Sequence, residues 1–253
     1  LPEIVLLRPV FAQGAVQALV ACSLHHQDVG GMTPGSLPPS AGSVHQEGLR
    51  IPPLRLYRQG QTDVALFRLL CTNSRTPDAL AGDIRTQWSV LLAADEALQL
   101  VLDDPADFQA QCQASIAASE AAVRAALRAA ADGDYRFAAV RENEAGAGDA
   151  LRVPVVLRKE GDRLTIDLSG CAGQSAGPCN ASRAAAWGAV SEFAGALAPG
   201  VAANAGCTAP LLLRSAPGTI VDPAFPAAVN GSAMIVELLS EGLHGAWAPA
   251  RRP

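Results

Sequence analysis

Histidine and carboxylate side chains gather in one short stretch of the sequence, and they carry the donor atoms of a metal site. Three of the four histidines lie between residues 25 and 45. His25 and Asp28 are three positions apart, and His45 lies at the far end of the stretch. Imidazole and carboxylate ligands suit a borderline or hard divalent ion. We therefore expect His25, Asp28 and His45 to hold zinc or manganese if the stretch folds back on itself. The alternative is a histidine and an aspartate that only hydrogen-bond to fix a loop.

Three more side chains around this stretch have types suited to catalysis. His26 is a candidate general base, because an imidazole titrates near neutral pH. Glu47 lies beside His45 and would converge with the first histidines if the loop folds back. Arg75 follows an apolar run and could offer its guanidinium to a carboxylate. Helix capping and surface ion pairing explain Arg75 as readily.

The stretch itself is predicted to be an ordered loop. Residues 25–53 are rich in glycine and proline, which disfavour regular backbone hydrogen bonding. A long loop without secondary structure inside a compact domain is usually functional. Before the loop, aliphatic and β-branched runs over 4–9 and 15–23 predict an antiparallel pair of strands. The second strand would deliver the two adjacent histidines at its end.

The rest of the chain separates into a helical block and a strand-rich block. A short strand over 54–57 is followed by helical spacing of apolar residues over 62–70, from 76 onward and over 105–131. From residue 134 the period of the apolar residues changes to two, which predicts strands over 135–141, 151–158 and 163–168. A helix is predicted over 180–198, and the remainder is predicted to be loop and strand. These patterns predict an α+β fold with mostly antiparallel strands and a central helical block. We place the subdomains at 1–133 and 134–253.

The composition favours a globular protein that binds neither nucleic acid nor membrane. The 253 residues carry a net charge of -5 and include a single lysine, whereas a nucleic-acid surface needs clustered cations. No apolar run reaches the roughly 18 residues of a membrane span. The six cysteines form no CxxC pair and are interpreted as reduced, so we expect a cytoplasmic location. Because the chain begins at Leu1 rather than methionine, we expect it to be a fragment of a longer protein.

Short motifs spread over residues 25–231 resemble one family when they are taken together. The first four are HHQDVGGMTPGSLPP, QEGLRIPPLRL, NSRTP and GDIRTQ, and the later ones are DLSG, GPCN, NAGCTAPL, APGTIVDP and PAAVNG. In this order they are similar to the B subunit of the hydantoinase/5-oxoprolinase family, which also includes the large subunits of acetone and acetophenone carboxylases. The segment after Gly231 departs from the family, because it lacks the expected Glu-Thr-Ser-x-Arg.

The resemblance implies a B-type subunit of an ATP-dependent hetero-oligomeric hydrolase. An A-type subunit would bind ATP and activate a carbonyl by phosphoryl transfer. This chain would then complete hydrolysis of a small cyclic amide of the hydantoin or 5-oxoproline type. The missing GxxxxGK[ST] phosphate-binding motif agrees with ATP being bound elsewhere. The resemblance also implies a divalent metal on His25 and Asp28, which would polarise the carbonyl or lower the pKa of a bound water.

The sequence leaves three other functions open. The chain could belong to an ATP-dependent ketone carboxylase, and bicarbonate dependence of ATP consumption would separate that from hydrolysis. It could be a truncated, non-catalytic subunit that only docks on an A-type partner. It could also be a stand-alone metallohydrolase, which would turn over without ATP.

Overall fold

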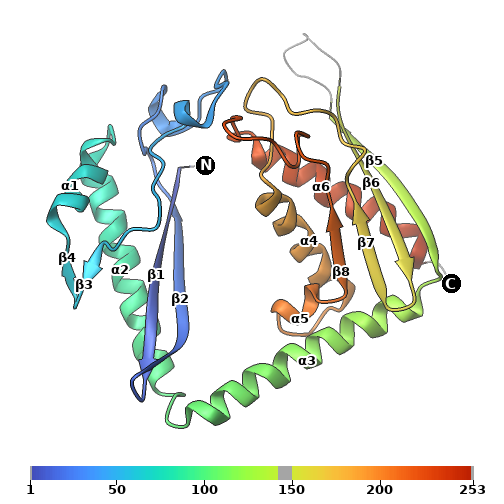
Figure 1. The fold of residues 1–253 in the computed structure, drawn as a ribbon, viewed down its shortest axis with the longest axis horizontal. Helices are drawn as coiled ribbons and strands as arrows, with labels where there is room; N and C mark the ends of the chain where they lie inside the picture. Colours follow the sequence, from blue (N-terminus) through green and yellow to red (C-terminus); the bar gives the residue numbers. More distant parts are fainter. Residues whose placement is uncertain (1, 142–149, 252–253) are drawn as a thin grey trace. The chain divides into compact units, whose positions relative to one another are not determined.

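The computed structural model describes residues 2–141 and 150–251, which fall into two compact units (Figure 1). Unit 1 runs to Ala110 and unit 2 begins at Gln111. The boundary lies inside one long helix, α3 (Pro105–Ala129), because the later turns of that helix belong to the core of unit 2. The sequence places the boundary further along, where α3 has ended. The combination of helices with mostly antiparallel strands confirms the predicted α+β class.

Unit 1 is built on a long β-hairpin. Strands β1 (Glu3–Ala12) and β2 (Ala15–His25) pair antiparallel from end to end, which confirms the predicted pair. They turn through Gln13 and Gly14, whose φ angles of 51° and 78° suit a two-residue hairpin turn. Helix α2 (Pro77–Gln99) packs against both strands. One face of the hairpin is therefore covered by α2.

A short hairpin and a second helix complete unit 1. Strands β3 (Tyr57–Arg58) and β4 (Gln61–Thr62) precede helix α1 (Val64–Thr72). The strand predicted over 54–57 is observed only at Tyr57, because the residues before it run along the surface and only Leu56 is buried. A small core joins the hairpin, the loop and both helices, and it contains Ile4, Val29, Leu56, Leu70, Leu80 and Ile84.

Unit 2 is a four-stranded sheet with helices on one side (Figure 1). The strands in spatial order are β5 (Gly133–Arg141), β6 (Leu151–Glu160), β7 (Arg163–Asp167) and β8 (Leu211–Arg214). Only β7 and β8 are parallel. The covering helices are α4 (Arg183–Leu197) and α6 (Ser232–Trp247), and a short helix, α5 (Ala205–Thr208), packs on α4. Since β7 and β8 run in the same direction, the loops that follow them leave the sheet at one end.

Helix α6 is the largest difference from the sequence prediction, which assigned this region to loop and strand. Its sequence contains Gly242 and Gly245, and glycine disfavours a helix interior. A Cβ at Gly242 would lie 2.6 Å from Cγ2 of Val155, and one at Gly245 would lie 2.7 Å from the ring of Phe137. The two glycines therefore let the helix lie close to β5 and β6. Burial against the sheet compensates for their poor helix propensity.

The single lysine of the chain is a structural group. Lys159 is 3% exposed, and its Nζ donates hydrogen bonds to the Ala130 carbonyl (2.6 Å) and to Oδ1 of Asp132 (2.7 Å). The Lys159 hydrogen bond is also the largest cause of the lowered pKa of Asp132. This contact joins β6 to the end of α3.

Two further features bear on the sequence predictions. All six cysteines are free thiols. In the part of the chain that the structure describes, no helix combines the length and the hydropathy needed to cross a bilayer.

The packing of α5 on α3 generates a test of the fold. A Cβ at Gly206 would overlap the backbone carbonyl of Ile116, whereas a Cβ at Gly188 in α4 would meet open space. We expect Gly206→Ala to lower the free energy of unfolding by about 1–3 kcal/mol or more. Gly188→Ala, the matched control, should raise it by about 0.5–1 kcal/mol. Urea denaturation of both variants measures the difference, and an unchanged midpoint for Gly206→Ala would contradict the packing described.

Candidate functional site

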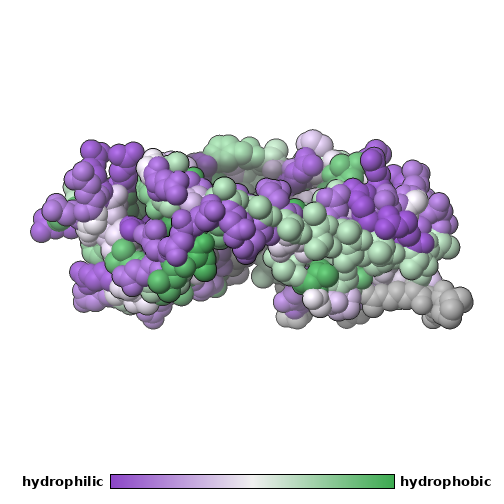
Figure 2. Space-filling view, turned by 90° about the horizontal axis from the view of Figure 1, so that it is seen from below, coloured by the Kyte–Doolittle hydropathy of each residue, from purple (hydrophilic) through white to green (hydrophobic). Residues whose placement is uncertain are grey.

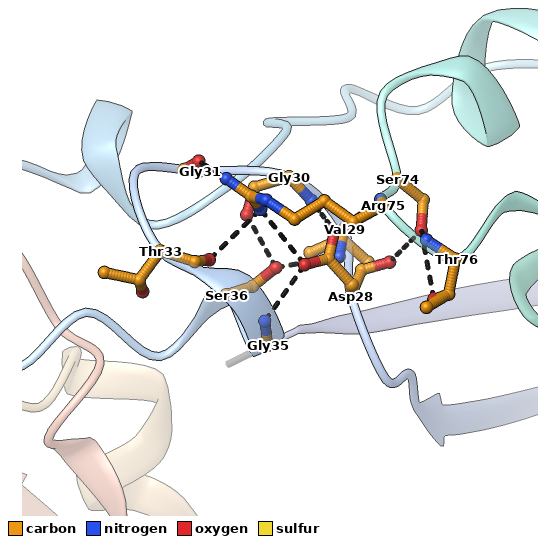
Figure 3. Close-up of polar contacts among 10 residues, drawn as sticks. All are labelled: Asp28, Val29, Gly30, Gly31, Thr33, Gly35, Ser36, Ser74, Arg75 and Thr76. Atoms are coloured by element: carbon orange, nitrogen blue, oxygen red, sulfur yellow. Dashed lines mark hydrogen bonds and ion pairs between the residues drawn. The ribbon is translucent and has the colours of Figure 1, made fainter.

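The carboxylate of Asp28 is the centre of the polar network in unit 1 (Figure 3). Its side chain is 2% exposed. Oδ1 accepts hydrogen bonds from the backbone N–H groups of Gly30 (2.9 Å) and Arg75 (3.0 Å). Oδ2 accepts from the backbone N–H of Gly35 (3.0 Å) and from Nη1 of Arg75 (3.0 Å). Four donors therefore surround one buried negative charge.

The turn between α1 and α2 holds the rest of the loop through Arg75 and Ser74. Figure 3 shows the Arg75 side chain reaching across Asp28 to two loop carbonyls. Nη1 donates to the carbonyl of Thr33 (3.1 Å), and Nη2 donates to that of Gly31 (2.8 Å). The Ser74 hydroxyl donates to the carbonyl of Asp28 at 2.8 Å. The segment following β2 is thus fixed from outside by residues that come much later in the chain.

The two adjacent glycines of the loop are required by close backbone contacts. Gly30 has φ of 89°, and a Cβ there would lie 2.8 Å from the carbonyl oxygen of Asn73. Gly31 has φ of 86°, and its Cβ would lie 2.8 Å from the carbonyl oxygen of Gln46. Both angles belong to the left-handed region that side chains rarely adopt. The glycines let the loop pass closely against two other segments.

The pKa of Asp28 is lowered from its ordinary value of 3.8. Burial is the largest influence and raises the pKa, because it disfavours the charged form. The hydrogen bonds from Arg75, Gly30 and Gly35 act in the opposite direction and together outweigh burial. The group is therefore a fixed anion in the folded chain at neutral pH.

His26, the predicted general base, lies inside the protein. It is 1% exposed, and its Nδ1 lies 3.0 Å from Oδ2 of Asp83 on α2. Its Nε2 is buried and has no hydrogen-bond partner among the described residues. One helical turn along α2, Gln87 donates through Nε2 to the carbonyls of Ile4 (2.8 Å) and Cys22 (3.1 Å). Asp83 and Gln87 thus attach the hairpin to α2, and His26 is out of reach of a substrate in this arrangement.

His25 lies on the opposite side of the strand end from His26, because side chains alternate along a β-strand. Its side chain is 52% exposed. Glu3 is its cross-strand partner, and Nδ1 of His25 lies 3.8 Å from Oε1 of Glu3. An accessible imidazole beside a carboxylate can accept and return a proton. Glu3 was absent from the residues predicted for the site, although its pairing with His25 follows from the hairpin register.

The three predicted metal ligands do not converge. Asp28 uses both carboxylate oxygens in hydrogen bonds, and His25 faces solvent. His45 is exposed on a 3-10 turn, η2 (Val44–Gln46). Within residues 2–141 and 150–251, no group of three or more histidine, cysteine, aspartate or glutamate residues is arranged to hold a metal. The donor set does not fit a resident ion, and metal binding stays a prediction from the sequence.

The two other predicted catalytic residues have different surroundings. Glu47 follows η2 and is 8% exposed. Arg75 keeps 42% of its side chain exposed, but its guanidinium is tied to Asp28 and to loop carbonyls. Arg75 therefore positions the loop.

A second polar network joins the loops at one end of the sheet in unit 2. Asn180 is fully buried, and its Oδ1 accepts from the backbone N–H of Ser175 at 2.8 Å. Its Nδ2 donates to the carbonyls of Ser175 (3.1 Å), Gly177 (3.0 Å) and Ala228 (2.8 Å). Ser182, two residues later, caps α4 instead. Asn180 therefore links the loop after β7 to the loop before α6.

Comparison with known proteins gives a consistent result. The family model described as hydantoinase B/oxoprolinase matches residues 1–252. A 5-oxoprolinase from Dictyostelium discoideum is 26% identical over 91% of this chain and 19% of its own length. The acetophenone carboxylase delta subunit of Aromatoleum aromaticum is 25% identical over 98% of this chain and 37% of its own length.

A solved structure agrees with these sequence matches. The crystal structure of ATP-dependent caprolactamase from Pseudomonas jessenii superposes with a TM-score of 0.88 and 25% identity, covering 99% of this chain and 44% of that chain. The chain thus spans less than half the length of these relatives.

Replacing the central carboxylate tests the network around it. In Asp28→Asn, the amide NH₂ would face hydrogen-bond donors of the backbone. The ion pair between the carboxylate and Arg75 would also be lost. We expect the free energy of unfolding to fall by about 3 kcal/mol. Asp103→Asn, an exposed control, should change it by less than about 0.5 kcal/mol. Equal denaturation midpoints for the two variants would show that Asp28 does not stabilise the loop.

The lowered pKa of Asp28 also predicts how stability depends on pH. The folded state holds the carboxylate ionised more strongly than the unfolded state does. The contribution of the Asp28 carboxylate to the free energy of unfolding should be complete above the ordinary pKa of 3.8. It should be lost as the pH falls from 3.8 through the lowered pKa of the folded state. The stability difference between wild type and Asp28→Asn should therefore shrink below pH 3.8. Chemical denaturation across this range measures it, and a constant difference would contradict the assignment.

Proposed function

Because the chain belongs to the hydantoinase B/oxoprolinase family, whose model matches residues 1–252, we propose that it is the B-type part of an ATP-dependent hydrolase. Its substrates would be small cyclic amides of the hydantoin or 5-oxoproline type. The family match over nearly the whole chain is the observation that carries this proposal. The likeness to an enzyme described as an ATP-dependent caprolactamase supports it, since a caprolactam is also a cyclic amide.

ATP would be bound by an A-type partner subunit, since this sequence has no GxxxxGK[ST] motif to cradle phosphates. In this proposal the partner transfers a phosphoryl group to the ring carbonyl oxygen. Water then adds to the activated carbon, and the ring C–N bond breaks as a proton reaches the departing nitrogen. A second water releases the phosphate.

His25 is the imidazole of this chain that we assign to proton transfer. Its exposure at the end of β2 lets it reach an attacking water, and the neighbouring carboxylate of Glu3 would stabilise the imidazolium that forms. The separation of 3.8 Å between His25 and Glu3 would shorten on substrate binding. Asp28 and Arg75 would hold the adjoining loop in place, and no step is assigned to a metal ion.

One alternative has specific support. The acetophenone carboxylase delta subunit aligns with 98% of this chain, which favours C–C bond formation in an ATP-dependent ketone carboxylase. Bicarbonate dependence of ATP consumption would identify this alternative. Stable complex formation without turnover would instead identify a subunit that docks without catalysis, the other function that the sequence leaves open.

Reconstitution tests the proposal directly. The chain mixed with a purified A-type hydantoinase/oxoprolinase subunit should couple ATP hydrolysis to opening of hydantoin or 5-oxoproline, with no need for bicarbonate. His25→Ala should lower kcat by about 10²–10⁴-fold, the usual contribution of a general base. His244→Ala, a control on α6, should leave kcat unchanged. Turnover of His25→Ala at the wild-type rate across the pH profile would refute the role of His25, and the absence of ATP-coupled ring opening would refute the proposed function.

A further inference from the structure

Exposed arginine and aliphatic side chains lie close together in the sequence of unit 1, between residues 54 and 69. The chain as a whole carries a net charge of -5, yet no aspartate or glutamate occurs between Glu47 and Asp63. Arg55 and Arg58 lie in this interval, and Arg68 follows on α1. All three are exposed, and none forms an ion pair within the described residues. Residues 54–69 therefore carry three exposed arginines and one exposed carboxylate, Asp63, on a chain that is acidic as a whole.

Exposed aliphatic side chains accompany these arginines. Leu54 is 54% exposed, and Val64 and Leu69 on α1 are 58% and 56% exposed. Figure 2 shows mainly hydrophilic residues (purple) at its left end, with a few paler and hydrophobic residues (green) among them. We define the arginine face as Arg55, Arg58, Arg68, Leu54, Val64 and Leu69. Hydrophobic area next to arginine is typical of protein interfaces.

The arginine face rests on a well-packed base. Tyr57 stacks on Trp88 of α2, with ring centroids 3.8 Å apart. The Asp63 N–H donates to the carbonyl of Leu56 at 2.8 Å, which ties the start of α1 to the segment before β3. Leu56 and Phe67 belong to the same hydrophobic cluster. A preorganised surface of this kind loses little freedom when a partner binds.

We propose that the arginine face is the docking surface for the A-type subunit, and that it meets a surface of that subunit rich in carboxylates and aliphatic side chains. This inference rests on the proposed function for the existence of the partner. The planar guanidinium can bind a carboxylate through two parallel hydrogen bonds, which favours arginine over lysine at such contacts. Complementary charge would also accelerate association.

The charge of the face decides between possible occupants. A second copy bound across a two-fold axis would bring the same three arginines together, and like charges destabilise such a contact. A nucleic acid would leave the exposed aliphatic groups without a partner, and the overall charge of -5 would oppose its approach. An acidic protein surface with aliphatic patches satisfies both kinds of side chain.

Charge reversal tests the docking surface. The full chain and its variants are titrated against the purified A-type subunit by biolayer interferometry at low and moderate salt. We expect Arg55→Glu combined with Arg58→Glu to weaken the affinity by about 10–100-fold, and to reverse the salt dependence of binding. The control is Arg163→Glu combined with Arg214→Glu, which makes the same change of charge at two exposed arginines of unit 2. Its affinity for the A-type subunit should stay within about twofold of that of the wild type. Thermal unfolding checks that each variant is folded, and Arg68→Glu is an independent variant on α1.

The outcomes separate this proposal from the proposed function. Wild-type affinity in both Arg55→Glu/Arg58→Glu and Arg68→Glu would overturn the docking surface, even if ring opening proceeds normally. Loss of a wild-type homodimer in light scattering, with no change in partner affinity, would also overturn it and would assign the face to a second copy. Binding that depends on the face without ATP-coupled ring opening would support the docking surface and refute the proposed function. If an excess of the A-type subunit restores the kcat of the variants to the wild-type value, the arginine face acts in docking alone.

Discussion

The buried charge of Asp28 is the constraint on which the organisation of unit 1 depends. A carboxylate that is 2% exposed is tolerated only when donors replace the water it has lost, and here two backbone segments and one guanidinium supply them. To do so, the loop must curl back on itself and the turn before α2 must close over it. Gly30 and Gly31 make that approach possible, because any side chain there would strike neighbouring backbone.

The same arrangement explains why the conspicuous motifs of unit 1 belong together. The motif HHQD meets NSRTP through Asp28 and Arg75, and it meets GDIRTQ through His26 and Asp83. Each motif supplies one side of a hydrogen bond that the other completes. The family resemblance of unit 1 is therefore carried largely by residues that build the loop. His25 differs, because it faces solvent beside Glu3 and has no comparable structural role.

Unit 2 uses an equivalent device with a neutral side chain. Asn180 accepts one backbone hydrogen bond, and its Nδ2 lies within hydrogen-bond distance of three backbone carbonyls, so that the motifs GPCN and PAAVNG are joined through a single amide. The amide suits this position, since it can both donate and accept, whereas a carboxylate could only accept. Loops that leave the end of a sheet often carry function on a rigid support. Here the support is made by Asn180 and by the close contact of Gly231 with the backbone of Pro178.

Elements with a local signal could be predicted from the sequence. Aliphatic and β-branched runs predicted the hairpin, periodicity of two predicted β5 to β7, and periodicity of 3.6 predicted α1 to α3. Glycine and proline predicted the ordered loop. The short motifs in register identified the family. These signals are readable because each depends on residues that are neighbours in the chain.

The accessibility of the chemical groups could not be predicted in this way, because it depends on contacts between distant parts of the chain. Asp28 and Arg75 are separated by 47 positions, and His26 and Asp83 by 57, so no local pattern reveals that they are partners. Helix α6 likewise depends on contacts with β5 and β6, because side chains in place of its glycines would overlap residues of these strands. Burial and long-range hydrogen bonding gave three predicted site residues, His26, Asp28 and Arg75, structural surroundings and left His25 at the surface. The reason is that desolvation depends on what surrounds a side chain in space rather than along the sequence.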